Sequence, residues 1–149
     1  MTELDKLMSN YEKSDVSDKY QIVLEVEFIE DYKKWNFFLE VLKSSNEEQI
    51  LIEVLKIVKC HSVPSNLFQQ YKNEILSLID KDDDWVLKSF CIIALEFCKN
   101  DNDVIEKSKS IIFDSKEFIN TRFNAFYLIE DYFIESEKQK IKIDLEKNL

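Results

Sequence analysis

The chain has 149 residues, of which 45% are hydrophobic and 34% are charged, a balance typical of a folded domain rather than a disordered segment. It contains no glycine and one proline, which excludes a glycine-rich phosphate loop and argues against a sheet built on glycine-dependent hairpin turns. The formal net charge of −10 repels nucleic acid and anionic membranes and favours a basic partner. We therefore expect an all-α protein, folded as a single domain over residues 1–149, that binds neither nucleic acid nor membrane.

Helical periodicity runs along almost the whole chain, with an apolar residue at every third or fourth position. Ser, Asn or Asp stands at most junctions, where the first free N–H groups of a helix need a cap. Ser17 and Asn46 are predicted N-caps, and Pro64 separates two helices. The predicted helices cover residues 3–13, 17–31, 32–43, 46–60, 67–80, 82–100, 101–113, 117–133 and 135–149.

Several of these helices share one pattern at a nearly constant spacing. The residues Leu87, Lys88, Cys91, Ala94 and Leu95 are followed 34 positions later by Thr121, Arg122, Ala125, Leu128 and Ile129. The same apolar places are occupied 37 positions earlier by Ile50, Val54, Ile57 and Val58. A period of this length indicates stacked helix pairs, in which each pair buries its apolar face against its neighbours.

The motif Leu87-Lys88-x-x-Cys91-x-x-Ala94-Leu95, with its copy from Thr121 to Ile129, resembles the second helix of HEAT and HEAT-like repeats. That helix typically reads V-R-x-x-A-x-x-A-L and follows an acidic turn. The resemblance covers roughly residues 31 to 134. It implies a short right-handed α-solenoid of about three HEAT-like helix pairs, with the N-terminal helices as a cap.

Three consecutive acids, Asp82, Asp83 and Asp84, precede Trp85. A calcium loop of the EF-hand type would need alternating acids, a glycine and a closing glutamate, which this stretch lacks. Helix starts favour acids because their N–H groups are free and the helix dipole is positive there, so at least one of the three is predicted to be a cap. The aligned turns of the other repeats are also acidic, at Glu47, Glu48 and Glu117. The acids would then form a ridge, which either binds a basic partner or simply keeps the protein soluble.

The helix after these aspartates is apolar on both sides. Its predicted buried stripe consists of Leu87, Cys91, Ala94, Leu95 and Cys98. The opposite side carries Trp85, Ser89, Ile92, Ile93 and Glu96, and its equivalent one repeat later carries Ile119, Phe123, Phe126, Tyr127 and Glu130. Such a side is either covered or binds another molecule. The sequence leaves two possibilities: a concave protein-binding surface, or a cover formed by the C-terminal helix through Ile141, Ile143 and Leu145.

The remaining candidates for chemistry are one histidine and three cysteines. His61 follows Cys60 at the end of a predicted helix, where histidine commonly serves as a C-terminal cap, although Ser–His or Cys–His pairs can form between residues distant in sequence. Cys91 and Cys98 lie on the buried stripe and are predicted to behave as small hydrophobic residues. We expect no catalytic residue, metal or cofactor. Reduced thiols and the lack of an apolar leader or span predict a cytoplasmic protein.

In size, charge and helical character the chain resembles the immunity proteins of bacterial toxin systems, including contact-dependent growth inhibition. The resemblance implies a non-enzymatic protein, monomeric when free, that neutralises a cognate toxin domain, typically a basic nuclease, by occluding its active site or substrate groove. The predicted partner-binding residues are aromatic anchors with acids around them: Asp82, Asp83, Asp84, Trp85, Glu96, Phe123, Tyr127, Glu130 and Asp131. The alternative is a HEAT-like adaptor or scaffold subunit of a larger protein assembly.

Overall fold

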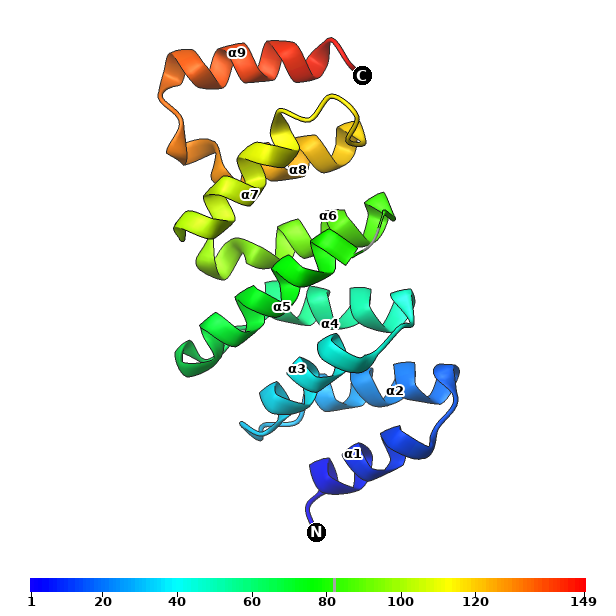
Figure 1. The fold of residues 1–149 in the computed structure, drawn as a ribbon. Coiled ribbons are helices and arrows are strands. Elements are labelled where there is room, and N and C mark those ends of the chain that lie inside the picture. Colours follow the sequence, from blue (N-terminus) through cyan, green and yellow to red (C-terminus); the bar gives the residue numbers. More distant parts are fainter. Residues whose placement is uncertain (82) are drawn as a thin grey trace. The chain divides into compact units, whose positions relative to one another are not determined.

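The computed structural model describes residues 1–81 and 83–149, and every regular element in these residues is helical (Figure 1). The predicted all-α class is therefore confirmed for this part of the chain. The chain separates into two compact units, Met1–Glu74 and Ile75–Leu149, and the boundary falls inside one helix, α5 (Phe68–Lys81). No helix among the described residues is both long enough and apolar enough to cross a membrane.

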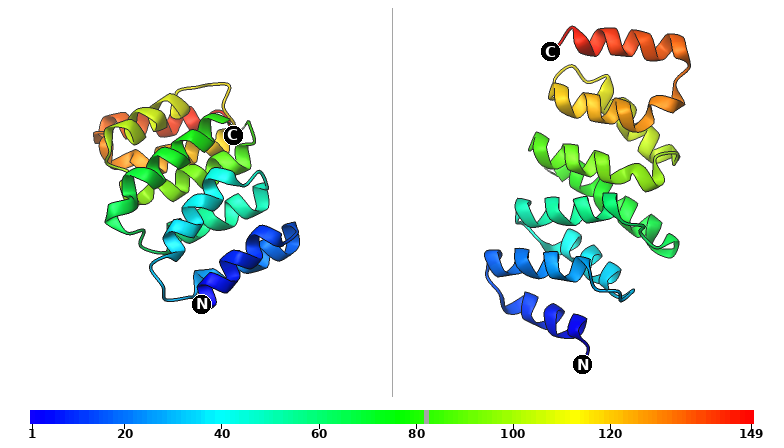
Figure 2. Two further views of the ribbon diagram at one scale, coloured as in Figure 1. Left: turned by 60° about the horizontal axis from the view of Figure 1, so that its bottom comes forward. Right: turned by 180° about the vertical axis from the view of Figure 1, so that it is seen from behind.

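The first unit is built from two helix pairs and the first part of α5. Its elements are α1 (Glu3–Lys13), α2 (Val16–Glu27), α3 (Lys34–Ser44), α4 (Glu48–Cys60) and a short 3-10 helix, η1 (Ser65–Leu67). Helix α1 packs on α2, α3 packs on α4, and α2 lies alongside α4 (Figures 1 and 2). The largest fully buried side chains of this unit are Leu4, Phe38, Leu42, Ile50, Leu55, Ile57 and Tyr71.

Helix α1 has the predicted boundaries because a capping box fixes its start. The hydroxyl of Thr2 accepts a hydrogen bond from the N–H of Asp5 at 3.1 Å, and the Asp5 carboxylate accepts one from the N–H of Thr2 at 3.1 Å. These hydrogen bonds stabilise the charged carboxylate and lower the pKa of Asp5 from its ordinary value.

Two predicted N-caps are wrong by one or two residues. Helix α2 is capped by Asp15 rather than Ser17, and the Asp15 carboxylate accepts a hydrogen bond from the N–H of Asp18 at 2.9 Å. Helix α4 begins after Glu47 rather than Asn46, and the Glu47 carbonyl oxygen accepts the N–H groups of the first helical turn at 3.0 and 3.1 Å. In both stretches several polar residues can accept a first-turn N–H, so their order alone does not select the cap.

Tyr71 joins α5 to α3 within the first unit. Its side chain is fully buried, and its hydroxyl donates a hydrogen bond to the carbonyl oxygen of Trp35. The two rings meet edge to face, with centroids 6.2 Å apart. Burial raises the pKa of Tyr71, because a phenolate would lose its solvation there. The hydroxyl therefore stays protonated and keeps its role as a donor.

The second unit is arranged around α8 (Ile119–Ile129). Its other elements are the last part of α5, α6 (Trp85–Ala94), η2 (Leu95–Cys98), α7 (Asn102–Ile112), η3 (Glu130–Tyr132) and α9 (Glu135–Glu146). Helices α6, α7 and α9 all pack on α8, and α6 and α9 lie on opposite sides of it (Figures 1 and 2). The predicted stripe is confirmed, since Leu87, Cys91, Ala94, Leu95 and Cys98 are all buried.

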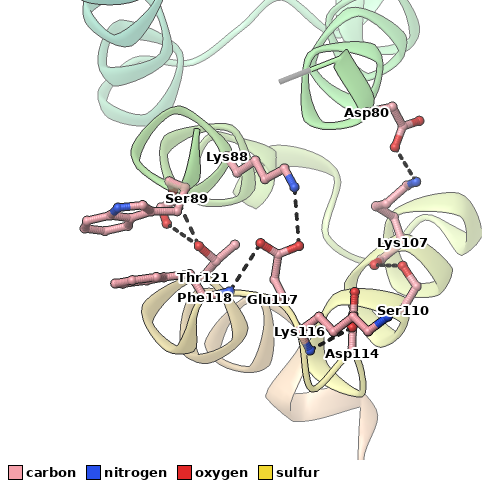
Figure 3. A network of polar contacts seen from close by, with 11 residues as sticks. Asp80, Lys88, Ser89, Lys107, Ser110, Asp114, Lys116, Glu117, Phe118 and Thr121 are labelled. Carbon is pink, nitrogen blue, oxygen red and sulfur yellow. Dashed lines mark hydrogen bonds and ion pairs between the residues drawn. The ribbon is translucent and has the colours of Figure 1, made fainter. Parts of the chain in front are cut away.

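Polar contacts fix α6 against α8 and the turn before it. Figure 3 shows Lys88 reaching from α6 to Glu117, with its Nζ 3.4 Å from the Glu117 carboxylate. The hydroxyls of Ser89 and Thr121 lie 3.1 Å apart, and the Thr121 hydroxyl donates to the carbonyl oxygen of Trp85 at 3.4 Å. These contacts hold the first turns of the two helices side by side.

Arg122 ties α8 to its other two neighbours. Its side chain is buried, and its Nε donates a hydrogen bond to the carbonyl oxygen of Ile112, at the end of α7, over 2.8 Å. Its guanidinium also lies 3.6 Å from the carboxylate of Asp144 in α9. Arg122 therefore satisfies a carbonyl group that the end of α7 leaves without a partner inside the helix.

Candidate functional site

A groove of about 590 Å³ lies between α6 and α8 in the second unit. The α6 wall consists of Trp85, Val86, Ser89, Phe90 and Ile93. The α8 wall consists of Asn120, Phe123, Asn124 and Tyr127, and Leu149 lines the groove from the C-terminus. Four of the positions on α6 and the four on α8 are related by the spacing of 34, so the groove lies where the same face of two equivalent helices meets.

The three predicted aromatic anchors all line this groove and all reach solvent. Trp85 is 38% exposed, Tyr127 is 58% exposed, and Phe123 is half-buried. The rings of Phe123 and Tyr127 stack with centroids 6.0 Å apart. The structure therefore brings the predicted anchors together on one surface.

Two other apolar residues that were predicted on this side point into the core instead. Ile92 and Phe126 are 1% and 0% exposed. Phe126 is buried because α8 packs on α7 and α9 as well as on α6, so the apolar stripe of α8 is wider than an ideal wheel with two opposite faces predicts.

Phe118 belongs to the same surface, and the sequence prediction missed it. Its ring stacks on the indole of Trp85, with centroids 4.3 Å apart and planes 15° apart. Phe118 is the N-cap residue of α8 and remains 44% exposed. A helical wheel omits a residue that precedes the helix, and this is why Phe118 was missed.

The C-terminal helix does not fully cover the groove. Ile141 and Leu145 are buried where α9 packs on α8, whereas Ile143 is 52% exposed. Of the described residues in the C-terminal segment, Leu149 alone lines the groove, and it is 80% exposed. The cover predicted for this helix is therefore only partial, since α9 packs on α8 through Ile141 and Leu145 but leaves Trp85 and Tyr127 exposed.

The aspartates before the groove have distinct positions. Asp82 lies outside the described residues. Asp84 is the N-cap of α6, since its carboxylate accepts hydrogen bonds from the N–H groups of Val86 at 2.8 Å and of Leu87 at 3.5 Å. The predicted capping role is thus confirmed for Asp84. Asp83 is exposed, and no ion pair or hydrogen bond joins it to the rest of the described chain.

The predicted acids after α6 and α8 are surface residues. Glu96, in η2, lies 3.0 Å from Lys99 and raises the pKa of that lysine through a hydrogen bond. Asp131 lies 3.8 Å from Lys138 with its side chain 86% exposed, and Glu130 is half-buried in η3. Exposed pairs of this kind contribute little to stability, so Glu96 and Asp131 can exchange their lysines for the basic groups of a partner.

Two asparagines in the groove were not predicted. Asn120 is exposed and Asn124 is half-buried, and they stand one helical turn apart on α8 beside Phe123 and Tyr127. Neither side-chain amide has a hydrogen-bond partner among the described residues. Their spacing of four residues is visible in the sequence. They were missed because the binding residues were predicted from apolar and charged side chains only.

The equivalent face of the first unit has a different chemistry. Between α2 and α4 a smaller depression of about 340 Å³ is lined by Tyr20, Glu48, Gln49, Ile52, Glu53 and Lys56. The five residues from α4 stand 37 positions before the five from the α6 wall. The Tyr20 hydroxyl donates to Glu53 at 3.3 Å, whose carboxylate also lies 3.9 Å from Lys56. The α4 positions equivalent to the α6 wall carry no aromatic residue, so a lining with several aromatic side chains belongs to the second unit and is not a general property of this helix face.

The histidine and cysteines show no shared site. His61 is the C-cap residue of α4, and its Nε2 lies 2.8 Å from the carboxylate of Glu27. Cys60 is exposed, whereas Cys91 and Cys98 are buried in the second unit as predicted. Within residues 1–81 and 83–149, no three His, Cys, Asp or Glu side chains gather closely enough to hold a metal ion.

Comparisons with protein-family models, with curated proteins and with solved structures found no match to this chain. The groove between α6 and α8 is therefore interpreted from its own geometry and charge.

Proposed function

We propose that this protein is an immunity protein that binds a basic bacterial toxin domain and occludes its active site or substrate groove. The observation that carries this proposal is the uncovered aromatic groove between α6 and α8. Apolar patches that a monomer leaves exposed and rimmed by polar groups usually mark binding sites, and Trp and Tyr are the residues most enriched among binding hot spots.

Charge supports a basic partner for this groove. The net charge of −10 attracts a cationic domain and speeds its encounter with the protein. Asp83 stands two residues before Trp85, and Glu130 stands three residues after Tyr127. An acid therefore lies close in sequence to the groove residues at each end. The bound state would combine buried aromatic anchors with ion pairs at the rim, and the free protein would be a monomer.

The proposed fold behind this function is a short right-handed α-solenoid of HEAT-like helix pairs. It is supported within each unit by the side-by-side packing of second helices, α2 with α4 and α6 with α8. It is also supported by the common burial of residues 34 positions apart, such as Cys91 and Ala125. Small-angle scattering tests it, because a solenoid has a radius of gyration well above the roughly 15 Å of a compact globule of this length.

The proposed function predicts that a neighbouring gene encodes a basic toxin domain, and that domain is the partner to test. Co-expression of this chain should restore growth of a host that produces that domain, and calorimetry should show a tight one-to-one complex. Trp85→Ala should weaken the complex by about 2 kcal/mol, roughly thirtyfold in the dissociation constant, because a buried aromatic anchor is lost.

Phe113→Ala is the matched control. Phe113 is an aromatic residue of the same unit, is 62% exposed, and does not line the groove, so its loss should leave the affinity unchanged. Equal affinities for the wild type and Trp85→Ala would refute the proposed surface. A stable complex with non-toxic proteins of the same cell, without any rescue of growth, would instead identify an adaptor or scaffold subunit.

A further inference from the structure

We propose that the groove between α6 and α8 binds an extended segment of the partner, and that Asn120 and Asn124 hydrogen-bond to the backbone of that segment. This inference rests on the proposed function, since it concerns the same groove, but it specifies the conformation and the chemistry of what binds there.

The spacing of the two amides matches an extended chain. Residues four apart on an α-helix are separated by about 6 Å along its axis. An extended chain advances about 6.6 Å over two residues, and alternate residues direct their N–H and C=O groups to the same edge. Asn120 and Asn124 can therefore reach residues i and i+2 of one extended segment that runs along the groove.

The chemistry of the amides matches the backbone as well. A primary amide has two N–H donors and one carbonyl acceptor, so it can pair with both the N–H and the C=O of one residue. The two amides have no partner within the described chain and are accessible to solvent. A bound helix would leave them unpaired, because its backbone groups are already hydrogen-bonded to one another. The pair therefore favours an extended segment over a helix.

The remaining walls determine which side chains fit. The aromatic faces of Trp85, Phe123 and Tyr127 suit apolar side chains and the aliphatic stems of lysine. The acids beyond the two ends of the groove suit basic groups. From Trp85 to Ile93 the α6 wall is about 12 Å long, which is the length of three to four extended residues. The segment is therefore short, with β-branched or other apolar residues between lysines or arginines.

The probe for this proposal is the peptide acetyl-Lys-Val-Lys-Val-Lys amide, whose valines favour an extended backbone. It is titrated into the full-length ¹⁵N-labelled protein. The expected result is saturable movement of the Asn120 and Asn124 side-chain NH₂ signals in the NMR spectrum. The charge-reversed peptide, with glutamate in place of each lysine, should cause no such movement.

Asn120→Leu and Asn124→Leu keep the approximate shape of the side chains but remove the amides. Together they should weaken binding of the peptide by about tenfold, through the loss of the backbone hydrogen bonds that the two amides make. Asn10→Leu is the matched control, because Asn10 is an exposed asparagine within helix α1 and outside the groove. A groove that recognises only apolar surface would bind the peptide equally well or more tightly after the two leucine substitutions, and that result would overturn the proposal.

Backbone methylation tests the same contacts with the protein unchanged. Two further peptides carry N-methyl groups on the valine nitrogens or on the nitrogens of the second and third lysines. Only one edge of an extended segment faces the amides, so one methylated peptide should lose about tenfold in affinity and the other should bind much like the parent. Equal binding of all three peptides, or no saturable binding of the parent, would contradict backbone recognition.

These results are distinguishable from a failure of the proposed function. If Trp85→Ala weakens the complex with the toxin domain while the leucine substitutions do not, the groove binds the toxin but does not recognise an extended backbone. If the peptide binds through the amides but no toxin domain is neutralised, the immunity function is wrong and the extended-segment site remains.

Discussion

Arg122 donates a hydrogen bond from its Nε to the carbonyl oxygen of Ile112, and this contact joins α8 to the end of α7 inside the core of the second unit. Replacing Arg122 with Ala leaves that carbonyl unpaired and removes a buried side chain. We expect the free energy of unfolding to fall by about 2 to 4 kcal/mol, measured by urea denaturation. Asp144→Asn is the control, because the Asp144 side chain is 65% exposed and its loss should cost less than about 1 kcal/mol.

Asp83 and Asp84 are adjacent in the chain, but only Asp84 is the N-cap of α6. Asp84→Ala removes an acceptor for the N–H groups of Val86 and Leu87 and should lower the free energy of unfolding by about 1 kcal/mol. Asp83→Ala should change it by less than about 0.5 kcal/mol, since Asp83 is exposed. Thermal unfolding followed by circular dichroism compares the two. Equal losses would mean that charge before the helix matters, rather than the cap itself.

Lys88 and Glu117 form an ion pair in which each side chain is 15% exposed. A double-mutant cycle with Lys88→Met and Glu117→Gln should give a coupling free energy of about 1 kcal/mol, because the pair is shielded from solvent more than a surface pair. The coupling should decrease only slightly between low and high salt. The pair of Lys138 and Asp131, with the aspartate side chain 86% exposed, serves as the comparison and should show almost no coupling.

The reactivity of the three thiols tests directly whether the core of the second unit is packed as described. Cys60 is exposed, and Cys91 and Cys98 are buried, so one thiol should react quickly with Ellman's reagent in the native protein. Cys60→Ser should abolish the fast reaction, and unfolding in guanidinium should expose two more thiols. Fast reaction of two or three thiols in the native wild type would show that the stripe of α6 is not packed as described.

The capping box at α1 predicts a dependence on pH. The pKa of Asp5 is lowered by its hydrogen bonds with Thr2, so this carboxylate stabilises the fold above its unfolded pKa, and the contribution is lost as the pH falls through the lower folded pKa. Thr2→Ala should move the pKa of Asp5 back toward its ordinary value of 3.8, as measured by NMR titration.

Helix positions could be predicted from the sequence because the apolar periodicity is nearly continuous and polar residues mark the junctions. The prediction was less accurate for the exact helix starts. The N-caps of α2 and α4 are Asp15 and Glu47 instead of Ser17 and Asn46. Neighbouring polar residues compete for the same N–H groups there, and the outcome depends on how the preceding chain arrives.

The sequence predicted the aromatic anchors of the candidate site, but it did not predict which other residues belong to the site. The helical wheel predicts Trp85, Phe123 and Tyr127 correctly. Ile92 and Phe126 are buried instead, and Phe126 is buried because α8 has packing partners on more than one side. The contributions of Phe118 and of the two asparagines depend on which helices lie side by side, and a single helix viewed alone does not show this.

Within each unit, every helix packs mainly on its neighbour in the chain or on the next but one. This arrangement has a kinetic consequence. Closing the short loops between such helices costs little chain entropy, so the contacts can form soon after each helix does. Domains dominated by local contacts fold on the order of microseconds to milliseconds. A nascent chain of this kind can begin to bury its apolar stripes while the ribosome is still adding the later helices, which shortens the time during which those stripes are open to aggregation.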